Sequence, residues 1–122
     1  MRPTSYLDNL ALADKCLAGI LQTLKQTGQL DSSTIVLMGD HGWRTIAVWR
    51  TSTAGTPEEK IASNSGQYDP RTVYLVKLPN QTTSAHIDAP YQTVNTRKLF
   101  DAVMSHQINT PADLSTWAHT TH

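Results

Sequence analysis

The stretch TIVLMGDHGW, residues 34–43, places a short apolar run directly before an acid and a histidine that stand between two glycines. Residues 34–38 are continuously apolar and partly β-branched, which is typical of a strand in the interior of a sheet, covered on both faces. In open α/β sheets, ligands collect just beyond the carboxyl ends of the strands. The sequence therefore predicts a strand that delivers Asp40 and His41 to a ligand site.

Neighbouring strand residues point to opposite faces, so Asp40 and His41 can share one ion only if the backbone curls. We expect Gly39 and Gly42 to allow that curl, because glycine enters positive φ without penalty. A carboxylate oxygen and a neutral imidazole nitrogen form a normal mixed ligand set for zinc, manganese or iron, although catalytic zinc usually takes three protein ligands. In the alternative interpretation, the acid caps a turn and the histidine packs nearby. Trp43 is expected to pack over the loop, with a substrate platform as its alternative role.

A long helix is predicted before the strand, over residues 5–26. Its apolar residues recur at helical spacing and are Leu10, Ala13, Leu17, Ile20, Leu21 and Leu24. Ser5 and Asp8 stand in the relation of a capping box, and Gly28 marks the far end. A helix followed by a buried strand points to an α/β layer structure.

The whole chain, residues 1–122, is predicted to be one α/β domain. The weak pattern from 44 to 70 indicates a surface excursion. The run TVYLVKL, residues 72–78, predicts a second strand. Helices are predicted over 94–105 and, in the tail, over 112–117.

Bulk composition excludes several classes of protein. Ten basic residues balance ten acidic ones in 122 residues, so nothing indicates a nucleic-acid binder. No apolar run is long enough to span a membrane, and the N-terminal residues do not form a signal peptide. The single cysteine, Cys16, excludes an internal disulfide and is expected to be a small packing residue in the first helix. No phosphate-binding glycine motif supports a nucleotide site.

The stretch YLDNLALADKCLAGILQTLKQTGQLDSSTIVLMGDHGW, residues 6–43, resembles a helix, turn and strand of the alkaline phosphatase superfamily. The similarity is greatest to its sulfatase-like and phosphoethanolamine-transferase-like branches, whose long helix leads to a "tG..d.T.vv..sDHG" pattern. RTVYLVKLPN, residues 71–80, and APYQTVNTRKLFDAVM, residues 89–104, extend the resemblance to about residues 5–105. It implies a layered α/β/α sandwich, of which this chain would be the C-terminal portion.

The resemblance assigns Asp40 and His41 as metal ligands and Gly42 as the residue that lets the loop turn. His86 is the candidate for a later ligand to a second metal, with an ordinary loop histidine as the alternative. Arg44, beside the loop, is the candidate for holding an anionic ester by two parallel hydrogen bonds, and a solvated or paired arginine is its alternative.

The function implied is that of a metal-dependent phosphate or sulfate ester hydrolase or transferase that uses zinc, manganese or calcium. In such proteins the nucleophile and the first acidic ligand belong to an earlier part of the chain. We therefore expect this chain to be inactive alone, and either self-associating or completed by an N-terminal segment. The resemblance to this superfamily also implies an extracytoplasmic location for the protein. The alternative is a stand-alone, non-catalytic α/β module that binds a metal or a partner.

Overall fold

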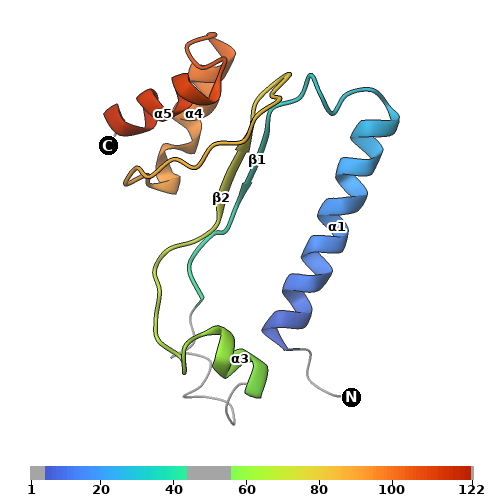
Figure 1. Ribbon diagram of the computed structural model, residues 1–122, viewed down its shortest axis with the longest axis vertical. Coiled ribbons are helices and arrows are strands. Elements are labelled where there is room, and N and C mark those ends of the chain that lie inside the picture. The colour runs from blue at the N-terminus through green and yellow to red at the C-terminus, as the bar shows by residue number, and fades with distance from the viewer. Residues whose placement is uncertain (1–4, 44–55, 122) are drawn as a thin grey trace. The chain divides into compact units, whose positions relative to one another are not determined.

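The structure, a computed structural model, describes residues 5–43 and 56–121. Its elements are α1 (Tyr6–Gln26), β1 (Ile35–Met38), α3 (Pro57–Ala62), β2 (Tyr74–Lys77), the 3₁₀ turn η1 (Thr93–Asn95), α4 (Thr96–Met104) and α5 (Pro111–Thr120) (Figure 1). They fall into two compact units, the first formed by Met1–Thr27 with Gly39–Thr72 and the second by Gly28–Met38 with Val73–His122. The mixture of helices with a small sheet confirms the predicted partial α/β fold.

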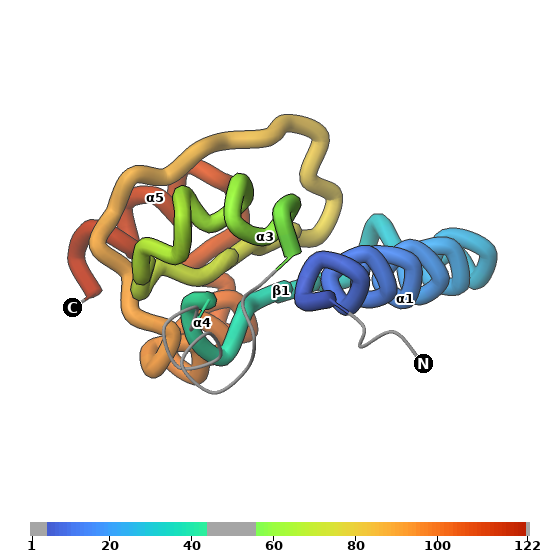
Figure 2. The backbone as a smooth tube through the Cα atoms, turned by 90° about the horizontal axis from the view of Figure 1, so that it is seen from below, coloured from blue at the N-terminus to red at the C-terminus, as the bar shows by residue number. Residues whose placement is uncertain are grey.

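In the first unit, α1 begins and ends where local signals place its ends. The hydroxyl of Ser5 accepts a hydrogen bond from the backbone N–H of Asp8 at 3.1 Å, and the Asp8 carboxylate accepts one from Ser5 N–H at 3.0 Å. These bonds, the backbone one first, lower the pKa of Asp8. Gly28 follows the helix with a φ of +70°, a left-handed conformation that suits glycine. The predicted capping box is confirmed, and α1 is one unbroken helix (Figures 1 and 2).

The apolar stripe of α1 is only partly covered. No residue of the helix is buried, and Leu10, Leu12 and Ile20 are each about half exposed. Cys16 is exposed too, so the expectation that it packs in the interior is wrong. No helix in the described residues is both long enough and apolar enough to cross a membrane.

The short helix α3 lies inside the stretch predicted to be a surface excursion. A helix is not expected there, but five of its six residues are exposed, so Pro57–Ala62 does lie at the surface. Thr56 and Glu59 form a second capping box, with Thr56 Oγ1 accepting from Glu59 N–H at 3.2 Å and Glu59 Oε2 accepting from Thr56 N–H at 2.9 Å. Glu59 Oε1 also accepts from the N–H of Tyr6 at 2.6 Å. This buried carboxylate therefore ties the start of α1 to the start of α3.

In the second unit, β1 and β2 pair antiparallel, with Val36 opposite Val76 (Figure 1). Both strands were predicted. The expectation that β1 is covered on both faces is wrong, because its first three residues are only half-buried and Met38 is 47% exposed. In the part of the chain that the structure describes, β1 has β2 as its single neighbour in the sheet.

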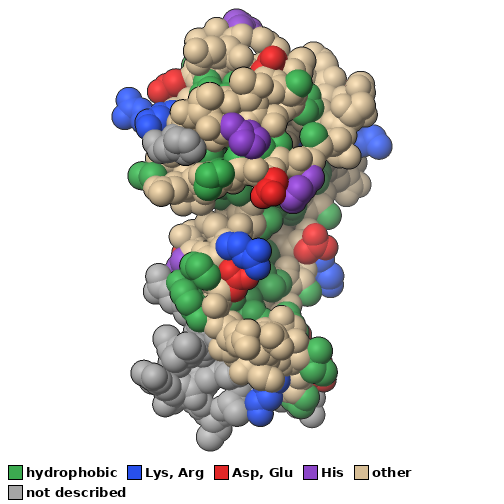
Figure 3. All heavy atoms as spheres, turned by 60° about the vertical axis from the view of Figure 1, so that its left-hand side comes forward, with side chains coloured by type: hydrophobic (Ala, Val, Ile, Leu, Met, Phe, Trp, Pro, Cys, Tyr) green, Lys and Arg blue, Asp and Glu red, His purple; other side chains and the backbone are tan. Residues whose placement is uncertain are grey.

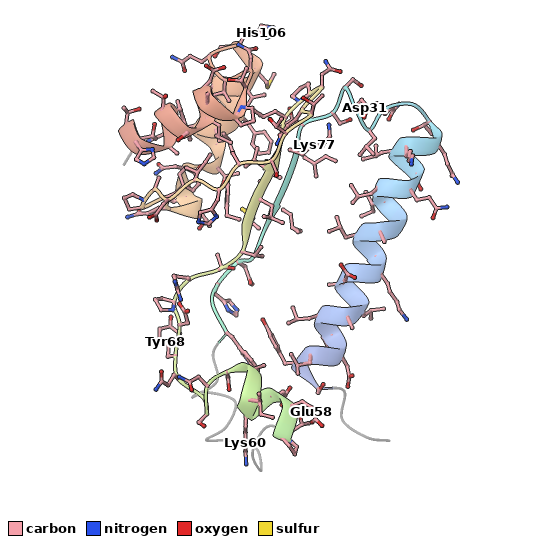
Figure 4. All side chains as sticks on the ribbon, in the orientation of Figure 1. Asp31, Glu58, Lys60, Tyr68, Lys77 and His106 are labelled. Atoms are coloured by element: carbon pink, nitrogen blue, oxygen red, sulfur yellow. The ribbon has the colours of Figure 1, made fainter. Side chains whose placement is uncertain are left out.

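Lys77 closes one end of this strand pair. Its ammonium donates to the carbonyl oxygens of Asp31, Ser33 and Leu78 at 3.0–3.2 Å, which uses all three of its donors. Asp31 and Lys77 lie at the same end of the strands in Figure 4. The lysine thus fixes the segment entering β1 to the end of β2.

The second unit has its own small core. Leu78, Leu99, Ala102 and Ile108 are buried together. The half-buried hydrophobic residues around them are Val36, Tyr74, Val76, Val103, Leu114 and Trp117. Helices α4 and α5 confirm the two predicted C-terminal helices, although α5 is longer than expected because Thr110 and Asp113 form a capping box at its start.

Leu99 is the core residue whose truncation tests this packing. We expect Leu99→Ala to lower the free energy of unfolding by about 2–5 kcal/mol, since it removes buried methyl groups and leaves a cavity. Leu12→Ala makes the same chemical change at a residue that is 60% exposed and should cost less than about 0.5 kcal/mol. Urea denaturation of both variants measures the difference, and equal losses would contradict the assigned core.

Candidate metal site

Asp40 and His41 lie in the loop that follows β1, and their side chains meet. Asp40 Oδ2 is 3.6 Å from His41 Nε2, while Asp40 Oδ1 accepts a hydrogen bond from the His41 backbone N–H at 2.9 Å. The Asp40 side chain is 89% exposed and that of His41 is 45% exposed. The backbone bends at residues 40–41, and the two side chains lie close together at the surface.

The imidazole of His41 is oriented by the next residue. Its Nδ1 lies 2.8 Å from the carbonyl oxygen of Gly42. A carbonyl oxygen can only accept, so Nδ1 carries the proton and donates it in this bond. In the neutral ring, Nε2 then keeps its lone pair on the side of the Asp40 carboxylate. Metal-binding histidines usually make such a bond from the ring nitrogen that does not touch the metal.

The two glycines serve the loop by their lack of a side chain and not by positive φ, so the reason expected from the sequence is wrong. Among the described glycines, neither Gly39 nor Gly42 has a positive φ. A Cβ on Gly39 would collide with the side chain of Thr72. A Cβ on Gly42 would collide with the carbonyl oxygen of Asp69 and lie 3.0 Å from that of Arg71. The loop is therefore pressed directly against the backbone of residues 69–72.

Trp43 packs, as predicted, and its partner is the first residue of α1. Its ring stacks on that of Tyr6 with centroids 4.6 Å apart and planes 13° from parallel. Because the Tyr6 N–H is held by Glu59, the stack links the loop to the starts of α1 and α3. The candidate site is thus supported by contacts from three parts of the first unit.

Beside the loop, still within the first unit, lies an open cleft of about 570 Å³. Its lining residues are Trp43, Ala62, Ser63, Asn64, Gln67, Tyr68, Asp69 and Arg71. Arg71 donates to both carboxylate oxygens of Asp69, at 2.7 Å from Nη2 and at 3.0 and 3.1 Å from Nε. These hydrogen bonds lower the pKa of Asp69 to about 2.

Two further residues, Arg44 and His86, are site candidates from the sequence. Arg44 lies outside the described residues. His86 lies on an exposed loop of the second unit. Within residues 5–43 and 56–121, no three histidine, cysteine, aspartate or glutamate side chains gather closely enough to hold a metal. The described site therefore consists of two ligand candidates.

The sequence model of one known family matches most of the chain. Residues 2–110 match the sequence model of the sulfatase family. The chain belongs to the sulfatase family. No curated protein and no solved structure matches it. Members of the sulfatase family generally use a divalent metal, and the match confirms the resemblance to the alkaline phosphatase-like superfamily.

Sequence reasoning missed the wall of the cleft in this sulfatase-family chain. Asp69 and Arg71 flank Pro70, and their opposite charges two residues apart are a weak signal for an ion pair. Tyr68 precedes them on the segment between α3 and β2 (Figure 4). Nothing local in the sequence indicates that this segment packs against the loop of Asp40 and His41, because the contact joins residues far apart in the chain.

Gly42→Ala tests the close approach of the loop. The added methyl group meets backbone atoms that cannot rotate away, so we expect the free energy of unfolding to fall by about 1–3 kcal/mol. Gly19→Ala is the matched control, since its Cβ meets nothing within 4 Å and alanine should stabilise α1 by about 0.5–1 kcal/mol. Thermal denaturation reports both changes, and a Gly42→Ala protein as stable as the original would contradict the packing.

Arg71→Ala tests the ion pair of the cleft by titration. Because the Asp69 pKa is lowered from 3.8 to about 2, the pair contributes stability above about pH 4 that is lost as the pH falls toward 2. Removing the guanidinium should return the Asp69 pKa toward 3.8. Carboxyl ¹³C shifts measured by NMR report it, and Asp8, whose lowered pKa depends on Ser5, should not move. An unchanged Asp69 titration would contradict the pair.

Proposed function

We propose that Asp40 and His41 bind a divalent cation in a metal-dependent enzyme that cleaves or transfers sulfate or phosphate esters. The observation that carries this proposal is the 3.6 Å separation of His41 Nε2 and Asp40 Oδ2, with Nδ1 anchored on the Gly42 carbonyl. Family membership supplies the chemical context, since the chain belongs to the sulfatase family. The two facts support each other, because the pair lies at the end of a strand, where α/β proteins hold ligands.

The distance between the two ligand atoms suits a shared ion. Two ligands about 2.1 Å from a tetrahedral zinc lie about 3.4 Å apart, close to the separation of Nε2 and Oδ2. Asp40 Oδ1 accepts a hydrogen bond from the His41 N–H, which leaves Oδ2, 3.6 Å from Nε2, as the oxygen available to the ion. An imidazole favours zinc or manganese over calcium, whose ligands are oxygen atoms.

The chain's own contribution to the reaction is the orientation of these ligands. A bound cation would neutralise charge on the transferring group and lower the pKa of an attacking hydroxyl. Gly42 holds the imidazole in the tautomer that keeps Nε2 unprotonated, and the backbone of residues 69–72 holds the loop. Two ligands are fewer than the three that catalytic zinc usually takes. We therefore propose that the nucleophile and the remaining acidic ligands come from a segment other than the described residues.

Metal titration tests the ligand pair. Asp40→Ala should weaken binding of Co²⁺ or Zn²⁺ by about a hundredfold or more, since it removes one of two ligands, whereas loss of an outer-shell partner alone costs about 10–100-fold. Calorimetry measures Zn²⁺ and visible absorption measures Co²⁺. Asp14→Ala removes an acid from the surface of α1 and is the matched control. Binding that survives Asp40→Ala, or that falls equally with Asp14→Ala, would reject the assignment.

Complementation tests the enzyme. The chain should show metal-dependent hydrolysis of a 4-nitrophenyl sulfate or phosphate ester when it is joined to a nucleophile-bearing N-terminal segment of a sulfatase-family protein, and Asp40→Ala should abolish it. If the joined protein binds metal but cleaves neither ester, the non-catalytic binding module becomes the better description.

A further inference from the structure

The ammonium group of Lys77, in the second unit, is surrounded by main-chain carbonyl oxygens. It donates to those of Asp31 at 3.1 Å, Ser33 at 3.0 Å and Leu78 at 3.2 Å. On the face shown in Figure 3, acidic and basic side chains are interspersed at the surface, whereas the side chain of Lys77 is half-buried. The other four lysines are all exposed and are Lys15, Lys25, Lys60 and Lys98. Lys77 is thus set apart by both its burial and its partners.

No carboxylate balances the charge of Lys77 in the described part of the chain. The ion pairs found there join Asp40 to His41 and Asp69 to Arg71. The positive charge is therefore met by carbonyl dipoles alone, and partial burial strengthens that attraction because less water screens it. Rings of backbone carbonyl oxygens are also the means by which proteins hold potassium ions without a charged ligand.

Two of the three carbonyl groups are held by further hydrogen bonds. The oxygen of Asp31 also accepts from the N–H of Asn80 at 2.6 Å. Leu78 is fully buried, and its own N–H donates to Gln81 Oε1 at 2.9 Å. The third carbonyl, that of Ser33, lies two residues before β1, which is itself paired with β2. We therefore expect the three oxygens to stay close together when the side chain of residue 77 carries no charge.

We propose that these three oxygens form a receptor for a monovalent cation, which the chain fills with its own ammonium group. The class of ligand is a primary ammonium ion or potassium. The separations of 3.0–3.2 Å suit N–H···O hydrogen bonds and exceed the distances of about 2.0–2.1 Å and 2.3–2.6 Å at which magnesium and calcium bind oxygen. The proposal does not depend on the metal pair of Asp40 and His41. Its consequence is that Lys77 makes the second unit stable without a bound ion.

Lys77→Met tests the receptor, because methionine is a long, unbranched side chain without charge. The variant should melt at a lower temperature than the unmodified protein, and a cation that fills the receptor should restore part of the loss by mass action. We expect potassium or methylammonium chloride at about 0.5 M to raise its melting temperature by at least about 2 °C more than tetramethylammonium chloride does. Tetramethylammonium matches the ionic strength but has no N–H donor and is larger.

Two proteins serve as controls for effects of salt in general. The unmodified protein should show no such difference among the three salts, because Lys77 already fills the receptor. Lys98→Met removes an exposed lysine from the same unit and should behave as the unmodified protein does. If Lys77→Met responds to the salts no differently from Lys98→Met, the proposal fails.

The same salts give the readout if Lys77→Met is unfolded in dilute buffer. Circular dichroism should then show refolding in potassium or methylammonium chloride and none in tetramethylammonium chloride. A variant that refolds in none of the three salts, or equally in all of them, would overturn the proposal.

Acetylation of the unmodified protein provides an independent measurement. After brief treatment with an acetylating reagent, peptide mass spectrometry gives the reaction rate of each lysine. Lys77 should react at least about tenfold more slowly than Lys98, because its ammonium must first leave three hydrogen-bond acceptors. Equal rates would show that the receptor does not hold the ammonium and would reject the proposal.

Discussion

The arrangement of the first unit depends on the contact of Gly42 with the backbone of the segment before β2. Gly42 is buried against the carbonyl oxygens of Asp69 and Arg71, where no side chain fits, and its own carbonyl accepts the Nδ1–H of His41. One residue therefore joins two features through its backbone. It orients the imidazole toward Asp40, and it holds the loop against a wall of the cleft. The Cβ of any larger residue would collide with the carbonyl oxygen of Asp69, so the two segments would have to move apart.

Local signals account for the parts that the sequence predicted correctly. The capping box of Ser5 and Asp8 and the left-handed Gly28 bound α1, and each acts within one helical turn. The strands β1 and β2 follow from short apolar runs. The placement of Asp40 and His41 side by side also follows locally, because both belong to the loop at the end of one strand. Each of these features is decided by residues close together in the chain.

The features that sequence reasoning missed depend on contacts between distant segments. Glu59 accepts a hydrogen bond from Tyr6, 53 residues earlier, and no short pattern indicates that partner. The sequence TPEE, residues 56–59, has the form of a capping box and could have indicated the start of α3. It stands among polar residues that are typical of a loop, so the helix was not predicted. Gly42 shows a further limit. A glycine is required both where φ is positive and where backbones approach closely, and the residue type alone cannot distinguish the two causes.

Two carboxylates of the first unit, those of Asp40 and Asp69, have different surroundings. At the loop, the Asp40 carboxylate and the His41 imidazole lie 3.6 Å apart, and in the described residues no third ligand candidate gathers with them. In the cleft, the carboxylate of Asp69 is already held on both oxygens by Arg71, so it has little capacity for a further charge.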